Sequence, residues 1–457
     1  MKLRYWILSI ALGSSMAAQA QELLSLQQCR EKALQYNKQI GAAERQTQQA
    51  RYTEKQYKAL FFPDFKASGT AIYSMADGSL DIAGGNLPTF LPDASGNFLP
   101  NNGFAYFPGL EMKYELGWLY TGGISLEQPL YMGGKIRAAN RIARYSREMA
   151  QHNERLTATE VILQTDEAYA LVVKAREMKQ VAEHYQALLD ELLKNVESAE
   201  RHGMKMRNDV LKVQVKRNEC TLNLKKAENA LRLATMNLCH AIGYPLHSVV
   251  MVSDELPEVP NVEDWKEIID RPEYAILQNK VAIAEQQIKL TRSEMLPQVG
   301  LMAGYNYTHG LKVNDCYLFE KGSASVMVNV TIPLFHFGER HNKVKAAKEA
   351  LRKAELEREN LNEQMLLELA ATSNNLEEAA LEQQIATQSL EQAEENRRMS
   401  QSQYKAGVET LSDHLEANAL WQAAHESAID ARYQHYIAYL KYIKAAGKLS
   451  ADAEARR

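Results

Sequence analysis

The strongest constraint on the fold is an internal repeat, because the chain contains one pattern twice. The stretch "QPLYMGGKIRAANRIA" begins at Gln128 and "IPLFHFGERHNKVKAA" begins at Ile332, so Pro129 and Pro333 lie 204 residues apart. The same separation relates Gly203 and Gly407, Asp209 and Asp413, Leu211 and Leu415, and Gly243 and Gly447. A constant offset predicts two copies of one structural unit that match without insertions over this part of the chain.

One long insertion distinguishes the first copy from the second. Nearer the amino terminus the offset is 234, since "FFPD" at Phe61 matches "MLPQ" at Met295, and 30 extra residues therefore lie between Pro63 and Pro129. They fall within "MADGSLDIAGGNLPTFLPDASGNFLPNNGFAYFPG". The Gly, Pro and Asn content of this stretch predicts a loop over residues 76–111.

Each copy is expected to run as helix, strand, loop, strand, helix, turn and helix. The expected strands are residues 64–75, 112–130, 298–309 and 323–334, and each alternates with period two. In the fourth strand, one face carries Val326, Val328 and Val330, and the other carries Ser325, Asn329 and Thr331. A half-buried sheet beneath helices is one interpretation. The other is a set of outer-membrane strands, which would need several chains, because four strands cannot close a barrel and lipid excludes an open sheet edge.

Two stretches, residues 134–201 and 338–405, contain no proline and no interior glycine. One helix over such a stretch would be ~100 Å long at about 1.5 Å per residue, which no globular core requires. Two apolar stripes lie side by side on the first stretch: Met178, Val181, Tyr185, Leu188 and Leu192, and then Ala182, Leu189, Leu193 and Val196. Two stripes predict neighbours on two sides, as in a cylinder of helices. Shorter helices are expected at about 25–62, 208–239, 272–295 and 411–446.

The amino terminus has the layout of a cleavable secretory signal. Lys2 and Arg4 precede an apolar run, and small residues end at Ala20, so residues 1–20 are expected to be removed. Removing two basic residues leaves 51 basic against 57 acidic ones. This negative balance argues against nucleic acid as a partner.

The four cysteines and the histidines show no spacing that indicates a chemical site. Cys29, Cys220, Cys239 and Cys316 are expected to be small buried apolar residues, with a Cys29–Cys239 bridge as the alternative. The chain has no His-Glu-x-x-His motif, and "YMGGK" has Pro129 and Ile136 where a phosphate loop needs Gly and Ser or Thr. We therefore predict that the protein is not an enzyme and has no metal or cofactor.

Together these residues resemble the TolC family of outer-membrane efflux proteins over nearly the whole mature chain. The stretches that carry the resemblance are "LSLQQCREKALQYNKQI", "PLYMGGK", "PLFHFGE", "RHGMKMRNDVLKVQ", "YKAGVETLSDHLEAN" and "IGYP". The resemblance implies a mainly α fold with membrane β-strands, in two tandem repeats over 21–243 and 271–447. Four strands per chain would join in a trimeric twelve-stranded β-barrel, continued by a long α-helical tunnel in the periplasm. Residues 244–270 would form an equatorial linker and residues 448–457 a C-terminal tail.

The resemblance also implies a function and partners. The protein would be a passive duct of a tripartite efflux system in the outer membrane, carrying drugs and toxic compounds. A homotrimer would contact outer-membrane lipid, a periplasmic adaptor (membrane fusion protein) and an inner-membrane pump, of the RND type or alternatively the ABC type. A type I protein secretion duct is a second hypothesis. A soluble periplasmic coiled-coil adaptor or scaffold is a third, against which the four long strands argue.

Asp413 and Glu416 are the most informative acids, because three residues of separation place them on one face of a helix. From the residues alone they are either first-turn acids favoured by the helix dipole, with Thr410 as a cap, or part of a carboxylate ring in a trimer that would attract cations. The resemblance matches them to acids that line the periplasmic aperture. It also matches Tyr404 and Asp209 to a polar link that closes this aperture, whereas Glu409 replaces the family's Arg and leaves a second link in doubt.

Glycines mark the two helical turns, expected at residues 202–207 and 405–410. Gly203 and Gly407 are expected to take the left-handed conformation that ends a helix, and the resemblance makes Met204 and Val408 contacts for the adaptor. At the strand-to-helix junctions, Pro129 and Pro333 are expected to end strands, and Gly134 and Gly338 to turn the chain into the long helices. The apolar residues of the 76–111 segment suggest that three copies narrow or cap the outer mouth.

Overall fold

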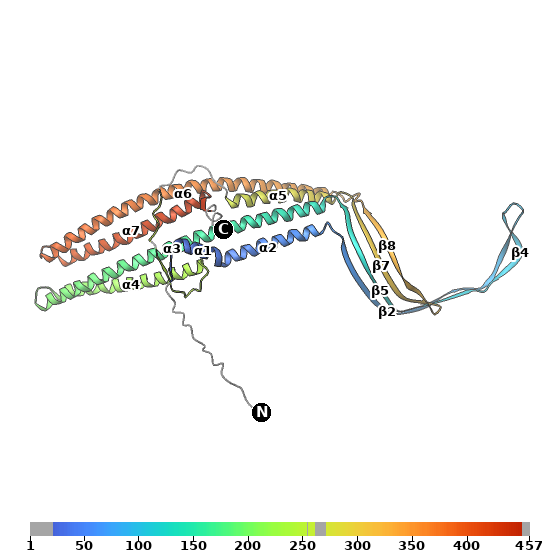
Figure 1. Ribbon diagram of the computed structural model, residues 1–457, viewed down its shortest axis with the longest axis horizontal. Helices are drawn as coiled ribbons and strands as arrows, with labels where there is room; N and C mark the ends of the chain where they lie inside the picture. Colours follow the sequence, from blue (N-terminus) through green and yellow to red (C-terminus); the bar gives the residue numbers. More distant parts are fainter. Residues whose placement is uncertain (1–21, 254, 261–270, 450–457) are drawn as a thin grey trace, which may run out of the picture. The chain divides into compact units, whose positions relative to one another are not determined.

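The computed structural model describes residues 22–253, 255–260 and 271–449. These residues form two compact units. Figure 1 shows the elements of both, coloured by residue number from the N-terminus to the C-terminus. The first unit contains the described residues up to Tyr52, Arg144–Ala282 and those from Leu351 onward, and the second contains Thr53–Ala143 and Ile283–Ala350. The expected signal peptide, positions 254 and 261–270 of the expected linker, and positions 450–457 of the expected tail lie outside the described residues.

Seven α-helices occur in the described residues, and their lengths repeat. They are α1 (Leu26–Tyr36), α2 (Lys38–Ala59), α3 (Lys135–Arg201), α4 (Arg207–Ala241), α5 (Pro272–Ser293), α6 (Glu339–Lys405) and α7 (Leu411–Ala445). Helices α3 and α6 have 67 residues each, α4 and α7 have 35 each, and α2 and α5 have 22 each. The equal lengths confirm the tandem repeat, and the two longest helices are each ~100 Å long.

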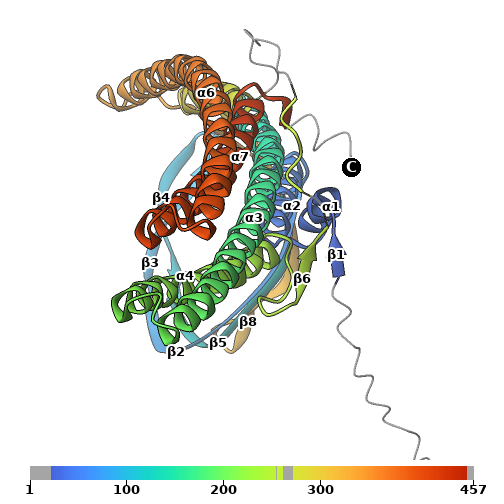
Figure 2. The same ribbon diagram turned by 90° about the vertical axis from the view of Figure 1, so that its left-hand side faces the viewer.

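In the first unit, the ends of four helices pack around one apolar cluster, which we name the tip cluster. Figure 2 shows α3 beside α4 and α6 beside α7. The cluster contains Tyr185, Leu189, Leu192 and Val196 of α3, Val210, Val213 and Cys220 of α4, and Leu411, Leu415 and Trp421 of α7, with Leu390, Ala393 and Tyr404 of α6 packed against it. Helix α3 therefore has neighbours on two sides, as its two apolar stripes predict.

A second apolar cluster lies where α1, α3 and α4 meet two short parallel strands, β1 (Glu22–Leu24) and β6 (Val250–Val252). Cys29 and Cys239 are both buried in this cluster and no disulfide joins them, so the alternative of a bridge between them is wrong. Cys220 is likewise buried, as expected. Cys316 is exposed, so the expectation that it is buried is wrong: it begins β8 directly after a tight turn.

The first helical segment is interrupted at Asn37, and the expectation of one helix over residues 25–62 is therefore wrong. Asn37 has an extended backbone, with φ −66° and ψ 128°, and separates α1 from α2. Its side chain donates to the carbonyl oxygen of Ala241 at 2.8 Å and accepts from the N–H of Gln39 at 2.8 Å. Because an asparagine side chain competes with the helical backbone for hydrogen bonds, this residue ends one helix and caps the next.

The second unit contains a four-stranded antiparallel sheet in the order β2-β5-β7-β8. Its strands are β2 (Asp64–Ile82), β5 (Leu110–Met132), β7 (Gln298–Val313) and β8 (Cys316–Thr331). The register forms rows across all four strands: Phe65, Leu126, Ala303 and Val326 in one row, and Lys66, Ser125, Gly304 and Ser325 in the next. Successive residues of a strand point to opposite faces, so the rows alternate between an apolar and a polar face, as the sequence predicts.

The inserted segment is not the loop expected over residues 76–111. Strands β2 and β5 remain paired as far as Ile82 and Leu110, and between them β3 (Gly85–Pro92) pairs with β4 (Phe98–Phe107). The N–H of Asp93 donates to the carbonyl oxygen of Asn97 at 2.8 Å and closes this hairpin. The turn and a break in register accommodate the glycines and prolines, while the intervening Phe, Leu and Tyr residues favour strands.

The two strand-to-helix junctions differ in the position of their prolines. Pro129 lies inside β5, beside a break in register with β7, so the expectation that it ends the strand is wrong. An irregular pairing tolerates the missing N–H of a proline. Pro333 follows the end of β8. Gly134 and Gly338 have φ of +87° and +82° and immediately precede α3 and α6.

Candidate functional site

The α3–α4 and α6–α7 turns have the same backbone structure. Gly203 and Gly407 have φ of +76° and +78°. The N–H of Met204 donates to the carbonyl five residues earlier at 2.9 Å, and Val408 makes the equivalent bond at 3.0 Å. These are the bonds of a Schellman motif, which glycine accommodates without strain. Met204 and Val408, the expected adaptor contacts, are 71% and 79% exposed.

An aspartate lies in the first turn of the helix that follows each reversal. Asp209 Oδ2 accepts from the N–H of Met206 at 3.3 Å. In the second copy, Thr410 Oγ1 donates to Asp413 Oδ2 at 2.7 Å and accepts from the N–H of Asp413 at 3.3 Å. These bonds satisfy groups at a helix N-terminus, where negative charge is also favoured. Within one chain, Asp209 therefore satisfies a backbone N–H at the start of α4, whereas Thr410 caps α7 and Asp413 holds the hydroxyl of this cap.

Glu416 lies at the contact between the two hairpins. It lines a groove of about 590 Å³ between α4 and α7, together with Lys212 and Lys216 of α4. Lys212 Nζ donates to Ser412 Oγ at 3.0 Å across this groove. Asp413 and Glu416 are both exposed, so both carboxylates remain accessible to solvent or to another chain.

The structure brings Tyr404 and Asp209 near each other, but no hydrogen bond joins these two described residues. Burial first, and then the negative charge of Asp209, raise the pKa of the Tyr404 hydroxyl. Lys205 Nζ, from the α3–α4 turn, lies 5.1 Å from the centre of the Tyr404 ring. Tyr404 is therefore the side chain of α6 that meets the other turn.

The ring of Tyr404 is stacked on His414, a residue that the sequence-based prediction missed. The two ring centres are 4.8 Å apart and the planes differ by 3°. His414 Nδ1 lies 3.1 Å from Ser400 Oγ, and His414 Nε2 lies 3.2 Å from Asn418 Nδ2. Only His414 and Asn418 have helical spacing, and Ser400 belongs to another helix, so no local pattern reveals this network.

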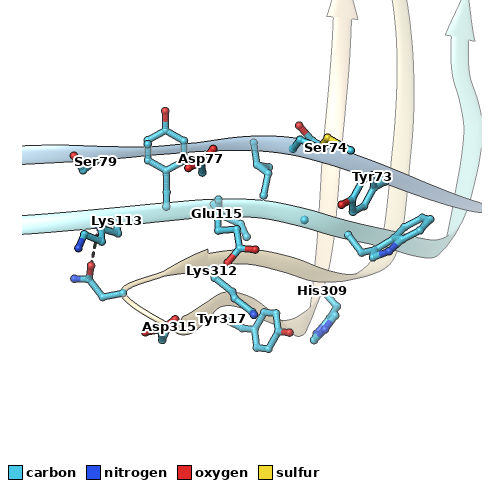
Figure 3. Close-up of a pocket in the computed structure, with 18 of the residues that line it drawn as sticks. Tyr73, Ser74, Asp77, Ser79, Lys113, Glu115, His309, Lys312, Asp315 and Tyr317 are labelled. Carbon is cyan, nitrogen blue, oxygen red and sulfur yellow. Dashed lines mark hydrogen bonds between the residues drawn. The ribbon is translucent and has the colours of Figure 1, made fainter.

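A row of aromatic rings crosses the sheet of the second unit. The centre-to-centre distances are 5.1 Å for Tyr73 and Trp118, 5.7 Å for Trp118 and Tyr120, 6.4 Å for Tyr120 and His309, and 4.5 Å for His309 and Tyr317. The row therefore includes a ring from each of β2, β5, β7 and β8. Figure 3 shows Tyr73, His309 and Tyr317 beside the hollow described below.

Charged residues lie on either side of an uncharged band in these strands. Strand β5 has none between Glu115 and Glu127, and β2 has none between Lys66 and Asp77. Strand β7 has none over residues 298–308, and β8 has none over residues 322–331. About ten residues suffice for a tilted strand to cross an outer membrane, and aromatic rings are typical of its boundary. The band therefore indicates a membrane-crossing sheet.

Beyond the aromatic row, where β5 separates from β7, the sheet has a hollow of about 1080 Å³. Its lining includes Asp77, Lys113, Glu115, Lys312 and Asp315, which are labelled in Figure 3. The lining holds both carboxylates and ammonium groups, and Glu115 lies between Asp77 and Lys312 in the register of the strands. The hollow lies on the charged side of the aromatic row.

Neither a metal site nor a membrane-spanning helix is found in residues 22–253, 255–260 and 271–449. In these residues, no three His, Cys, Asp or Glu side chains gather in a way that could hold a metal ion. In the same ranges, no helix is both long and apolar enough to cross a membrane.

Comparison of this sequence with profiles of known protein families identifies the family of the chain. The profile of the family described as "Outer membrane efflux protein" matches residues 29–244 and 269–448. The chain belongs to the outer membrane efflux protein family. This membership confirms the resemblance inferred from the sequence, places this efflux protein in the outer membrane, and identifies it as a channel rather than an enzyme.

Individual relatives of this outer membrane efflux protein are distant in sequence but similar in length. Outer membrane efflux protein BepC of Brucella suis biovar 1 (strain 1330) is 22% identical over 336 residues, which are 73% of each chain. Alkaline protease secretion protein AprF of Pseudomonas aeruginosa is 22% identical over 349 residues, covering 73% of this chain and 71% of that protein. The crystal structure of VceC from Vibrio cholerae has a TM-score of 0.73 at 16% identity, covering 92% of this chain and 96% of that one, and shows the same fold.

Proposed function

We propose that this efflux protein works as a homotrimer whose three sheets close into one twelve-stranded barrel. The observation that carries the proposal is the pair of free sheet edges, β2 with 19 residues and β8 with 16 residues. Unpaired backbone N–H and C=O groups cost several kcal/mol each in hydrocarbon. Each edge must therefore pair with the edge of another chain.

Strand direction and register favour this closure. Every neighbouring pair in the sheet is antiparallel. With four strands per chain, β8 of one chain runs antiparallel to β2 of the next around a ring. The apolar row begins at Phe65 and ends at Val326, and the polar row begins at Lys66 and ends at Ser325. Closure therefore joins like rows and leaves one face for lipid and one for an aqueous lumen.

The native mass of the detergent-solubilised protein tests this assembly. A trimer has about three times the mass of one mature chain, and the full chain is 51.6 kDa. A dimer or a tetramer would give eight or sixteen strands and would contradict the trimer. A monomer that remains folded in a bilayer would contradict any shared barrel.

In the trimer, the helical unit forms a periplasmic tunnel, and the two helical turns bind a periplasmic adaptor. The support is the exposure of Met204 and Val408, two apolar side chains held out by rigid glycine turns. The adaptor, a membrane fusion protein, links the duct to an inner-membrane pump of the RND type, or alternatively the ABC type. Replacing both side chains with Glu should abolish adaptor binding in pull-down experiments. Normal trimer mass with normal adaptor binding would contradict this contact.

The proposed cargo is small toxic compounds, including drugs. The similarity to BepC supports efflux, whereas the similarity to AprF supports a second candidate function, type I secretion of a protein. A deletion strain distinguishes them. Efflux predicts increased sensitivity to several toxic compounds with unchanged exported proteins, and secretion predicts the loss of one exported protein.

We propose that the tunnel closes at the turns through Tyr404 and Asp209, and that Asp413 and Glu416 line the aperture. The support is the effect of Asp209 on the Tyr404 hydroxyl and the exposure of both acids. Three chains bring six carboxylates together, which attracts cations. Replacing Asp413 with Asn and Glu416 with Gln should weaken block by a trivalent cation complex. The matched exposed control is Glu394→Gln, and unchanged block in the double variant would leave Asp413 and Glu416 as acids favoured only by the helix dipole.

The β3–β4 hairpin is proposed to narrow the outer mouth. Phe90, Phe98 and Phe104 are 51%, 72% and 69% exposed in one chain, so the hairpin has apolar surface available for two other copies. Deleting residues 85–107 keeps the β2–β5 pairing and should raise single-channel conductance. Unchanged conductance in a deletion variant that still forms trimers would contradict the proposal.

A further inference from the structure

The tip cluster contains a polar network in the second turn that the first turn lacks. Ser400, His414 and Asn418 are 3%, 8% and 6% exposed, and they lie among apolar residues of four helices. At an offset of 204, the equivalents of Ser400 and His414 are Val196 and Val210, which are 2% and 0% exposed. The repeated turn can therefore be packed with apolar side chains, and the polar network is not required by its backbone.

The hydrogen bonds assign the proton of the neutral His414 ring. Asn418 Nδ2 donates to the backbone oxygen of His414 at 2.7 Å and lies 3.2 Å from His414 Nε2. An amide nitrogen only donates, so Nε2 is the acceptor and carries no proton. Nδ1 therefore carries the proton and donates to Ser400 Oγ at 3.1 Å.

A second proton does not fit this arrangement. A proton on Nε2 would place two donors against each other at 3.2 Å. Turning the Asn418 amide would instead place its oxygen against the His414 carbonyl, which now accepts at 2.7 Å. Each rotamer of Asn418 thus opposes the charged ring, and a protonated His414 must leave its position. Because the Tyr404 ring is stacked on it at 4.8 Å, Tyr404 loses its support.

Charged groups from every neighbouring element surround this ring. They are Glu409 in the turn, Arg397 and Lys405 of α6, Glu191 of α3, and Lys205 and Asp209 beside Tyr404. Burial lowers the pKa of His414; Glu409 opposes this, and Arg397 and Lys405 add to it. Glu409 Oε2 is buried and has no hydrogen-bond partner within the described residues, so a carboxylate is available to receive the displaced imidazolium.

We propose that His414 is a positioning residue for Tyr404, and that its protonation releases Tyr404 and makes the closed turns open more readily in acid. This inference rests on the proposed Tyr404–Asp209 closing link. The proton that binds His414 is the ligand. Its binding breaks the contact between the α6–α7 turn and the α3–α4 turn.

The sign of the pH effect follows from the lowered pKa of His414 in the closed form. Above about pH 6.5, the ordinary histidine pKa, the ring is neutral in both forms and the closed form has its full stability. As the pH falls below that value, the open form binds a proton that the closed form excludes. The equilibrium constant for opening, the ratio of open to closed form, then rises by up to about ten-fold per pH unit for each His414, until the lowered pKa is passed.

Single-channel recording of the full trimer in planar bilayers tests the inference. The wild-type conductance should rise when both chambers are taken from about pH 7.5 to about pH 5.5, the range in which histidine changes charge. His414→Gln should show no such rise, because glutamine remains neutral. His425→Gln, on the same helix but outside the network, should respond as the wild type does. Glu409→Gln should move the response to lower pH, since it removes the charge that favours the proton.

Two further variants keep the outcome decisive. The double variant Ser400→Val with His414→Val copies the buried pair of the first turn and should have a conductance that does not change with pH, which covers the case in which His414→Gln does not assemble. Tyr404→Phe should raise conductance at every pH. If it does not, the proposed closing link is wrong. If it does, but the wild type and the His414 variants respond alike to acid, the link stands and the role of His414 is overturned.

Discussion

The α3–α4 and α6–α7 turns have one backbone structure and two different interiors. Both reverse the chain at a left-handed glycine, and both place an aspartate in the first turn of the next helix. Beneath this shared backbone, two buried valines in the first turn are replaced by Ser400 and His414 in the second. The comparison shows that the turn motif determines where the chain reverses, while the buried pair determines how the hairpin responds to its surroundings.

The repeat also inverts a charge at one position. Lys212 in the first copy corresponds to Glu416 in the second, and both line the groove between α4 and α7. Two copies of one unit thus meet with opposite charges at equivalent positions. Such divergence gives one chain a contact between unlike hairpins, which two identical repeats would lack.

The largest expected effect comes from Leu189, which is 1% exposed in the tip cluster shared by both turns. Leu189→Ala should cost about 2–5 kcal/mol and loosen both turns together, because the cavity borders both hairpins. Hydrogen exchange of the first turns of α4 and α7 measures this. Leu420→Ala, at a position 52% exposed, is the control and should change little. Loosening of only one turn would show that the cluster is not shared.

Placing a histidine in the first turn, at the position equivalent to His414, tests the difference between the buried side chains of the two turns. Val210→His should cost about 1–3 kcal/mol, because the new ring has no hydrogen-bond partner in the apolar first turn. Thermal unfolding followed by circular dichroism gives the loss. Val215→His, on the 56% exposed surface of the same helix, is the matched control. A cost equal to that of the control would mean that the first turn tolerates a buried polar ring.

Substitution of the two turn glycines tests whether the turns share one backbone structure. Gly203→Ala and Gly407→Ala should each cost about 1–2 kcal/mol from left-handed backbone strain alone. Nothing lies within 4 Å of a methyl group added at either position, so no steric difference is expected. The two melting temperatures should fall equally, and a clear inequality would argue against a common backbone motif.

The smallest effect is expected at the caps. Thr410 caps α7 with its hydroxyl, whereas the first copy has Met206 at that position, 76% exposed. Met206→Thr should stabilise the first turn by about 0.5–1 kcal/mol by adding the missing acceptor. Met206→Val gives a β-branched control without a hydroxyl. Equal stability of the two variants would mean that Asp209 already satisfies the helix end.

The sequence predicts the features that depend on local or periodic patterns. Gly203 and Gly407 indicate turns because few residues adopt a positive φ, and the alternation of Val326, Val328 and Val330 with polar neighbours indicates a strand. It does not predict the break at Asn37, which depends on a hydrogen bond to Ala241 on another helix. The β3–β4 hairpin was missed because its glycines and prolines are typical of loops. The His414 network was missed because its partners come from two helices.

The equal lengths of the repeated helices give the two helical hairpins of the chain the same length. Helices α3 and α6 both have 67 residues, and α4 and α7 both have 35, so the α3–α4 and α6–α7 hairpins contain equal numbers of helical residues. Removing seven residues from each helix of a single hairpin would shorten that hairpin by about 10 Å. The turns at Gly203 and Gly407 would then no longer end at the same distance along the helices. Any change in reach therefore requires matched insertions or deletions in both halves of the gene, which ties the two copies together even where their side chains have diverged.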